Sequence, residues 1–498
     1  MISLTVAVLL VVVTAYLYYR YNTLSSPLFP PGPRKSWLTG NTLNIPLTTP
    51  WITYANWARQ YGKFMGLRIS GEGDVVIINS LDAARDLLER RAQIYSDRPF
   101  STMDDLGGWH FNVGAMPYGD RWRKHRRLFQ QSFRPAAIQN FQPTQRRKIH
   151  DLVVNLVNGP DEYEKHVGAA MGAIIMSTIY GHDKLQKNDP FIETAEKASQ
   201  MRGLFPHSGE VPCQHFPSWL PGCDFQRYAQ MCRGYTRATQ DEPFKFALEQ
   251  TKRNNASSLV AGLVEQLDPQ DPSYAGNLER IRNVAATIYL AGSSTSKSVI
   301  LTFMLAMTLN PLAQAKAQEE IDRVIGTQRL PDFTDRKRLS YVEAVYRETA
   351  RWYPAVPLGT PRRAVQTDMY DGYCIPEGTT MYPNIWAISR DETRFEDPDC
   401  FKPERFLDSG GPFASINDML LFGFGRRVCP GRHMADAQVW MAIVSILATL
   451  KIEKGKDTKG NDVQLGVDYT DTLICHPKHF QCSITPRMPQ YMLISSAQ

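Results

Sequence analysis

The spacing of apolar positions divides the chain into a short region of mixed character and a long region of helical character. Between residues 37 and 88, short apolar runs such as residues 75–78 predict a small sheet accompanied by helices. Over residues 122–450 the apolar positions recur at helical spacing, and strand and turn signals return at residues 372–382 and near the C-terminus. The pattern predicts a mainly α protein with a minor β-sheet region.

The chain begins with an uncharged apolar stretch, residues 2–19, which is followed by four prolines. Its length is close to the roughly 20 residues that cross a bilayer, and three tyrosines stand at its end. A cleaved signal peptide is the alternative, but a basic leading region and a small-residue cleavage site are missing. We expect residues 1–20 to form a single-pass transmembrane anchor, residues 21–36 a stiff Pro-rich hinge, and residues 37–498 one large cytosolic domain.

Composition narrows the class of protein further. A chain of 498 residues with 43% hydrophobic content can bury a large core, and no linker or repeat divides it after residue 40. The net charge of +6 is mild, so we expect no nucleic-acid partner. The eight cysteines are scattered without metal-ligand spacing, which is typical of a reducing compartment.

One of these cysteines, Cys429, lies in a Gly-rich loop at residues 422–431, which reads Phe-Gly-Phe-Gly-Arg-Arg-Val-Cys-Pro-Gly. Such a loop suits a thiolate that serves as the axial ligand of an iron porphyrin. Glycines at Gly423, Gly425 and Gly431 allow positive φ and let the backbone approach a flat macrocycle. Exposed backbone N–H groups around the sulfur can stabilise its negative charge.

The arginine two positions before the cysteine, Arg427, can donate a charge-assisted hydrogen bond to a haem propionate. The alternative is an ordinary buried cysteine. However, the spacing Phe-x-x-Gly-x-Arg-x-Cys-x-Gly, from Phe422 to Gly431, is matched at every fixed position. The decapeptide resembles the haem-binding signature of the cytochrome P450 superfamily.

A second segment, Ala-Gly-Ser-Ser-Thr at residues 291–295, interrupts an apolar helix predicted over about residues 281–309. Glycine inside a helix costs about 1 kcal/mol relative to alanine, so Gly292 serves either close packing or a local opening of the helix. The segment resembles the family's oxygen-activation motif, which implies that Gly292 shapes the helix and Thr295 manages oxygen and protons. Ser294 stands where the family has Asp or Glu, so protons must travel through hydroxyls, water or another acid.

Two further motifs resemble elements of the same family. Glu348 and Arg351 stand three apart on a predicted helix and share one face, and a Pro-Glu-Arg-Phe segment with Arg405 follows. The resemblance implies a structural network of these three residues near the haem.

The resemblance also assigns haem contacts outside the cysteine loop. It implies that the haem propionates are bound by Trp122, Arg126, Arg362 and Arg427. Residues 121–127 form a basic run, and a charge run of this kind is usually a solvated helix face. With the cations Arg426, Arg432 and His433 it could instead form a docking face for an acidic flavoprotein.

The substrate pocket is implied by the same resemblance. It would draw on residues 104–111 and on six apolar side chains, with residues 205–225 as an access and membrane-contact loop. The six side chains are Ala291, Ala355, Val356, Leu358, Leu473 and Ile474.

Together these features imply a haem-thiolate monooxygenase with haem b bound at Cys429. No nucleotide-binding signature is present in the chain, so electrons must come from a separate NADPH-cytochrome P450 reductase. Several short elements look most like fungal microsomal members, which implies the endoplasmic reticulum membrane, contact with membrane lipid, and a hydrophobic small-molecule substrate such as a terpenoid or polyketide. Two alternatives stay open: a haem-thiolate isomerase, dehydratase or peroxide-driven catalyst, and a non-catalytic haem binder.

Overall fold

The computed structural model describes residue 14 and residues 28–46, 48–183, 189–203, 225–253, 258–407 and 415–487. The predicted anchor, apart from Thr14, lies outside these residues, as do the first part of the predicted hinge and all but one residue of the predicted loop at 205–225.

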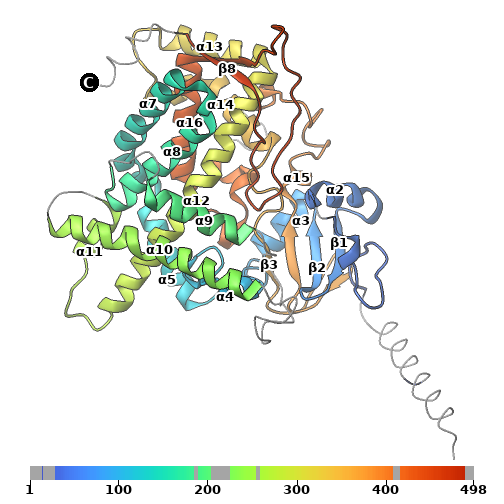
Figure 1. Ribbon diagram of the computed structural model, residues 1–498. Coiled ribbons are helices and arrows are strands. Elements are labelled where there is room, and N and C mark those ends of the chain that lie inside the picture. The colour runs from blue at the N-terminus through green and yellow to red at the C-terminus, as the bar shows by residue number, and fades with distance from the viewer. Residues whose placement is uncertain are drawn as a thin grey trace, which may run out of the picture.

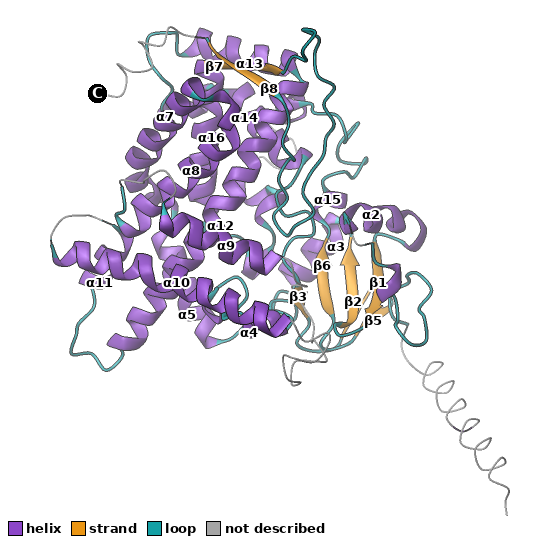
Figure 2. Ribbon diagram, viewed as in Figure 1, coloured by secondary structure: helices purple, strands orange, loops and turns teal. Residues whose placement is uncertain are grey.

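Helices account for most of the described chain (Figure 2). They are α2 (Pro50–Tyr61), α3 (Leu81–Arg85), α4 (Thr102–Leu106), α5 (Asp120–Ser132), α6 (Pro135–Ile138), α7 (Gln142–Asn158), α8 (Tyr163–Ile175), α9 (Pro190–Gly203), α10 (Phe225–Lys252), α11 (Leu259–Glu265), α12 (Tyr274–Leu309), α13 (Pro311–Val324), α14 (Ser340–Trp352), α15 (Ile385–Ile388) and α16 (Arg432–Thr449).

The strands form one larger and two smaller sheets. They are β1 (Phe64–Ile69), β2 (Gly73–Ile78), β3 (Arg362–Arg363), β4 (Asp368–Tyr370), β5 (Tyr373–Ile375), β6 (Thr380–Pro383), β7 (Leu450–Lys454) and β8 (Cys482–Pro486). The larger sheet has the order β1-β2-β6-β3, in which β2 and β6 run parallel while the other two pairs are antiparallel. The sheets β4-β5 and β7-β8 are antiparallel pairs.

The larger sheet lies to one side of the helical body, beside α2, α3 and α15 (Figure 1). The four apolar residues 75–78 of β2 are fully buried, which explains why this strand reads as an unbroken apolar run and does not alternate. The expectation of a mainly α protein with a minor sheet region is confirmed.

The long helix α12 is the centre of the helical body, where it packs against α8, α16 and α10. Residues 283–290 and 298–308 of α12 are buried without interruption, so this helix is apolar nearly all round. No single helix in the described ranges is both long and apolar enough to cross a membrane. Helices α12 and α13 meet that test only as a pair, which is bent by 106°.

Candidate active site

The loop that carries Cys429 joins the core to the start of α16, and its own main chain closes it. The Cys429 N–H donates to the carbonyl oxygen of Phe422 at 2.8 Å. Gly425 has φ +53°, and a Cβ there would lie 2.0 Å from the Leu88 carbonyl oxygen, so no side chain fits. Gly423 also has positive φ, as expected. Gly431 does not adopt the positive φ that a glycine allows: its φ is −88°, and it is the residue that precedes α16.

The Cys429 sulfur is buried, and three neighbouring groups partly offset the effect of that burial on its pKa. Burial raises the pKa of this thiol, whereas a hydrogen bond from the Gly431 N–H and the charges of Arg126 and Arg432 oppose that shift. The sulfur also lies just before the N-terminus of α16, where the helix dipole stabilises an anion. The site therefore provides one backbone donor and two nearby cations that would stabilise a thiolate ligand.

Four arginines are buried around this loop: Arg98, Arg126, Arg362 and Arg427 are each at most 8% exposed. Within the described part of the chain none of them forms an ion pair. Burial, with repulsion among the four, lowers the pKa of Arg427 to about 8 and that of Arg98 to about 9. The pKa of Arg362 falls well below its usual value for the same reasons. Since buried cations need anionic partners, the cluster fits a group with two carboxylates.

Two of these arginines have nitrogens left over for such a group. Arg362 donates through Nη2 to the Phe424 carbonyl at 2.9 Å, while its Nε and Nη1 have no partner among the described residues. Arg126 donates through Nη2 to the Val428 carbonyl, and its Nε is likewise without a partner in the described chain. Val428, whose carbonyl Arg126 contacts, is the residue before Cys429. The buried donors that remain on Arg126 and Arg362 fit the propionates of a haem.

Arg427, which the resemblance assigns to a propionate, donates to main-chain carbonyls in the structure. Its Nε and Nη2 donate to the carbonyls of Ser96 and Met116, both at 2.8 Å, and its Nη1 lies 3.4 Å from that of Val113. The guanidinium stacks on Trp122 at 4.2 Å. Its hydrogen bonds fix the cysteine loop to residues 96–116, and its contact with a propionate stays a prediction.

Sequence reasoning missed Arg98, which donates to the carbonyls of Gly114, Thr360 and Pro361. It belongs to none of the motifs, and only its burial beside Arg362 and Arg427 reveals it.

Helix α12 continues through residues 291–295 without a break. A Cβ at Gly292 would lie 3.1 Å from Ile175 Cδ1, so of the two interpretations of this glycine the structure favours close packing against α8. Ala291 is nonetheless exposed in the middle of this buried helix, which indicates open space beside it. Thr295 lies one turn on, and its hydroxyl donates to the Ala291 carbonyl at 2.7 Å.

The predicted pocket residues come from three segments that the structure ties together. Ser298 on α12 donates to the Cys475 carbonyl, and the Cys475 N–H donates to the Ala355 carbonyl at 2.8 Å. These bonds place the turn that carries Leu473 and Ile474 against both α12 and the segment after α14. Ala355 is buried, and the remaining predicted side chains in these two segments are half-buried: Val356, Leu358, Leu473 and Ile474.

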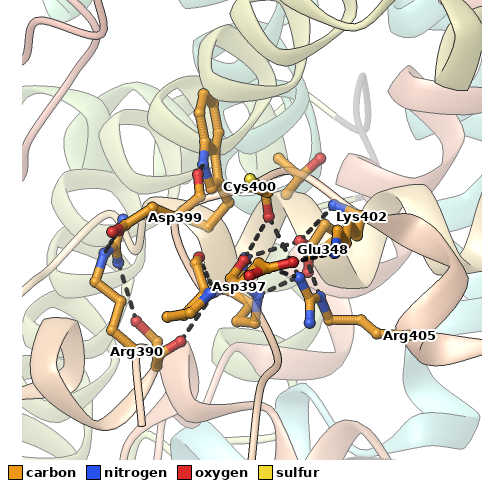
Figure 3. A network of polar contacts seen from close by, with 12 residues as sticks. Glu348, Arg390, Asp397, Asp399, Cys400, Lys402 and Arg405 are labelled. Atoms are coloured by element: carbon orange, nitrogen blue, oxygen red, sulfur yellow. Dashed lines mark hydrogen bonds and ion pairs between the residues drawn. The ribbon is translucent and has the colours of Figure 1, made fainter. Parts of the chain in front are cut away.

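The carboxylate of Glu348 lies at the centre of a buried ion network (Figure 3). Arg351 donates from Nε and Nη2 to the two carboxylate oxygens of Glu348, each at 2.7 Å, and Arg405 Nε lies 3.2 Å from Glu348 Oε1. The Lys402 N–H adds a hydrogen bond at 2.8 Å. Arg351 also donates to main-chain carbonyls, among them that of Ser389. The structure thus joins α14 to the segment that leads to the cysteine loop.

The chain is similar in sequence to one family of known proteins. The Cytochrome P450 family model matches residues 30–483. The Cytochrome P450 monooxygenase COX1 of Coprinopsis cinerea is 37% identical over 480 residues, which cover 93% of this chain and 92% of that protein. Cytochrome P450 monooxygenase 208 of Postia placenta is 36% identical over 97% of this chain and 94% of its own length.

A third relative, the Cytochrome P450 monooxygenase ple1 of Rhodocybe pseudopiperita, is 36% identical over 92% of this chain and 89% of its own length. The match extends over nearly the whole chain, and the buried arginines beside Cys429 fit the cofactor of these enzymes. The chain therefore belongs to the cytochrome P450 family.

Proposed function

We propose that this protein is a membrane-tethered haem-thiolate monooxygenase that inserts one oxygen atom of O₂ into a hydrophobic small molecule. The second oxygen atom leaves as water, with two electrons from NADPH through NADPH-cytochrome P450 reductase and two protons from solvent. The observation that carries the proposal is the closed Cys429 loop among four buried arginines. The family membership and the monooxygenase relatives support the reaction class.

In this proposal Cys429 holds the iron of haem b, and Arg126 and Arg362 bind the propionates through their unpartnered nitrogens. Haem held by a thiolate supplies the oxygen-activating chemistry. Thr295 acts beside the exposed Ala291, where its bond to the Ala291 carbonyl fixes its rotamer. The chain's own contribution is to bind, to orient and to supply protons in a space shielded by the core.

The substrate would lie against the apolar side chains of the pocket, namely Ala291, Val356, Leu358, Leu473 and Ile474. Ala291 is exposed and the other four are half-buried, and their apolar surface favours a lipophilic molecule over a charged one. The class that we propose, a terpenoid, polyketide or similar secondary metabolite, rests on the likeness to fungal members of the family.

A basic surface next to the cysteine loop supports docking of an acidic electron donor. Arg426 on the loop donates to the hydroxyl of Tyr118 at 2.8 Å, and Arg123 of α5 stacks on the same ring at 5.4 Å. Lys124 and Arg127 of α5 are exposed. The structure thus brings the two basic segments together, and positive charge at this face would steer the reductase flavin domain.

The first test is the carbon monoxide difference spectrum of the dithionite-reduced protein. We expect a red-shifted Soret band in the wild type, loss of that band in Cys429→Ser, and an unchanged band in the control Cys400→Ser, since Cys400 is exposed. A wild type without haem absorbance, or a Cys429→Ser variant with the wild-type band, would refute the proposal.

The second test concerns the electron source. Product should form with NADPH and reductase together, and should be lost when either is left out. Turnover with peroxide alone at the same rate, or with no electron donor, would favour the peroxide-driven or isomerase alternative.

A further inference from the structure

Ser294, which stands where the family has a carboxylate, has a histidine as its neighbour in the structure. The Ser294 hydroxyl on α12 lies 3.4 Å from Nε2 of His476, at the long end of a hydrogen bond. His476 belongs to the turn at residues 470–477, 182 positions away in sequence. The same turn carries Leu473 and Ile474 of the predicted pocket, so the pair lies beside the space next to α12.

The position of this histidine is fixed by its main chain. The His476 N–H donates to Thr470 Oγ1 at 2.9 Å, and the Thr470 N–H donates to the His476 carbonyl at 2.8 Å. The preceding residue, Cys475, is bonded to both Ser298 and Ala355. The imidazole is therefore held against α12 by the fold and does not depend on a flexible side chain alone.

The two ring nitrogens of His476 have different surroundings. Nε2 faces Ser294, whereas Nδ1 is buried and has no partner among the described residues. A buried ring nitrogen of this kind needs a hydrogen-bond partner, and water is the group that can supply one. A histidine with one nitrogen toward water and the other toward a hydroxyl can take a proton on one side and release it on the other.

The charges around the ring keep it neutral. Burial and the nearby Lys297 of α12 lower the pKa of His476 to about 4, and Glu164 of α8 acts weakly in the opposite direction. Glu164 also accepts a hydrogen bond from Nδ1 of the exposed His479 at 2.9 Å. A neutral imidazole can change tautomer, which lets it pass protons without holding a charge.

We propose that His476, acting through Ser294, supplies the proton path that the missing carboxylate would otherwise provide. Nδ1 takes a proton from water in the same step in which Nε2 gives its proton to the Ser294 hydroxyl, so the ring stays neutral, and Ser294 releases its own proton toward the space beside Ala291. A tautomer shift through water then returns the proton from Nδ1 to Nε2, so that one proton moves inward for each one taken up. The inference rests on the proposed monooxygenase function and names His476 as a positioning residue for it.

The test compares four variants of the haem-loaded protein: His476→Gln, Ser294→Ala, the double variant and Ser294→Asp/His476→Gln. We expect His476→Gln and Ser294→Ala each to raise peroxide released per product formed by between about 10- and 100-fold, near the low end of what a positioned proton donor contributes. The double variant should be no worse than either single variant. Ser294→Asp should restore coupling in the His476→Gln background.

A second readout does not depend on turnover. In the wild type, ¹⁵N NMR of histidine-labelled protein should show a His476 ring that stays neutral down to about pH 4, and Ser294→Ala should shift its Nε2 resonance. His166→Gln is the control, because His166 on α8 bonds only the Gly159 carbonyl and should change neither the ring signal nor coupling.

The inference fails if His476→Gln leaves the peroxide-to-product ratio unchanged, or if Ser294→Ala leaves the Nε2 resonance of His476 unmoved. These failures are distinct from failure of the proposed function, because the carbon monoxide band and product formation by the wild type are measured on the same preparations.

Discussion

At the scale of single residues, the four buried arginines show that the protein chain by itself is electrostatically incomplete. None of the four forms an ion pair among the described residues, and burial lowers the pKa of all four. Repulsion from other members of the cluster adds to this effect at Arg98, Arg362 and Arg427. Such an arrangement costs stability unless an anion neutralises it. Haem binding and folding are therefore expected to be coupled, since the anion that relieves the repulsion belongs to the cofactor.

This coupling predicts opposite effects of one substitution on the two forms of the protein. Arg362→Met removes a buried cation whose Nε and Nη1 have no partner among the described residues. The haem-free protein should become equally or more stable, because repulsion from Arg98 and Arg427 falls. Haem should dissociate roughly 10- to 100-fold faster, because a charge-assisted hydrogen bond is worth about 1.5–3 kcal/mol.

The matched control for that prediction is Arg363→Met, the next residue of β3, whose side chain is exposed. Thermal melts of both forms and transfer of haem to an acceptor protein measure the two effects. Equal haem loss from Arg362→Met and Arg363→Met would show that Arg362 does not hold the cofactor.

The residues of the site were predictable where a short motif fixes them and not elsewhere. Cys429 and its glycines follow from a ten-residue pattern, and Arg126 and Arg362 from the family resemblance. Arg98 and the proposed relay residue His476 were not predicted, because each lies far from the motifs in sequence and only the fold brings it to Arg362 or to Ser294. Gly431 does not adopt the positive φ that a glycine allows.

At the scale of elements, periodicity located the long helices well because their buried faces extend over many turns. Helix α12 and the helix that carries Glu348 both lie where the apolar spacing places them. The sequence left two interpretations of Gly292 open, because a glycine that makes room for Ile175 looks the same in sequence as one that opens a helix. A side chain on another helix decides between these readings, and the sequence of α12 does not contain it.

The network that joins α14 to the segment before the cysteine loop gives a prediction at this scale. Glu348→Gln removes the charge that neutralises Arg351 and Arg405, and leaves Arg351 buried without a counter-ion. Loss of one partner of a buried pair costs about 3–5 kcal/mol, so we expect a large fall in melting temperature and in folded yield.

Glu343→Gln on the same helix is the comparison, since Glu343 pairs with Arg336 and Arg347 at a site whose side chains are partly exposed. Partly exposed pairs contribute less, so its melting temperature should fall clearly less. Equal falls in melting temperature for the two variants would show that the Glu348 network stabilises the fold no more than a partly exposed ion pair does.

At the scale of the whole molecule, the second half of the predicted hinge is part of the folded unit. The Cys374 N–H donates to the Leu28 carbonyl at 2.9 Å, and the Gly66 N–H donates to that of Pro31 at 2.9 Å. A Cβ on Gly32 would lie 2.0 Å from the Gly66 carbonyl oxygen, so the two segments are in close contact. We therefore propose that the catalytic domain begins near residue 28, with a shorter tether before it.

Two truncations separate the tether from the domain. A chain that begins at residue 28 should keep the carbon monoxide band and the melting temperature of the full chain, and should lose most of its binding to membranes. A chain that begins at residue 37 should melt at a lower temperature, because the N–H groups of Gly66 and Cys374 lose their partners and Phe29 no longer packs on the sheet. Each buried donor left without a partner costs about 1–3 kcal/mol.

Membrane binding is measured by co-sedimentation with microsomes and stability by thermal melts, with the full chain beside both truncations. If the chain that begins at residue 37 has the same melting temperature as the chain that begins at residue 28, then residues 28–36 are a spacer and the domain boundary lies at 37. If the shorter chains still sediment with microsomes, the N-terminal segment is not the tether. The pair of truncations therefore fixes both the start of the domain and the means by which it is held at a membrane.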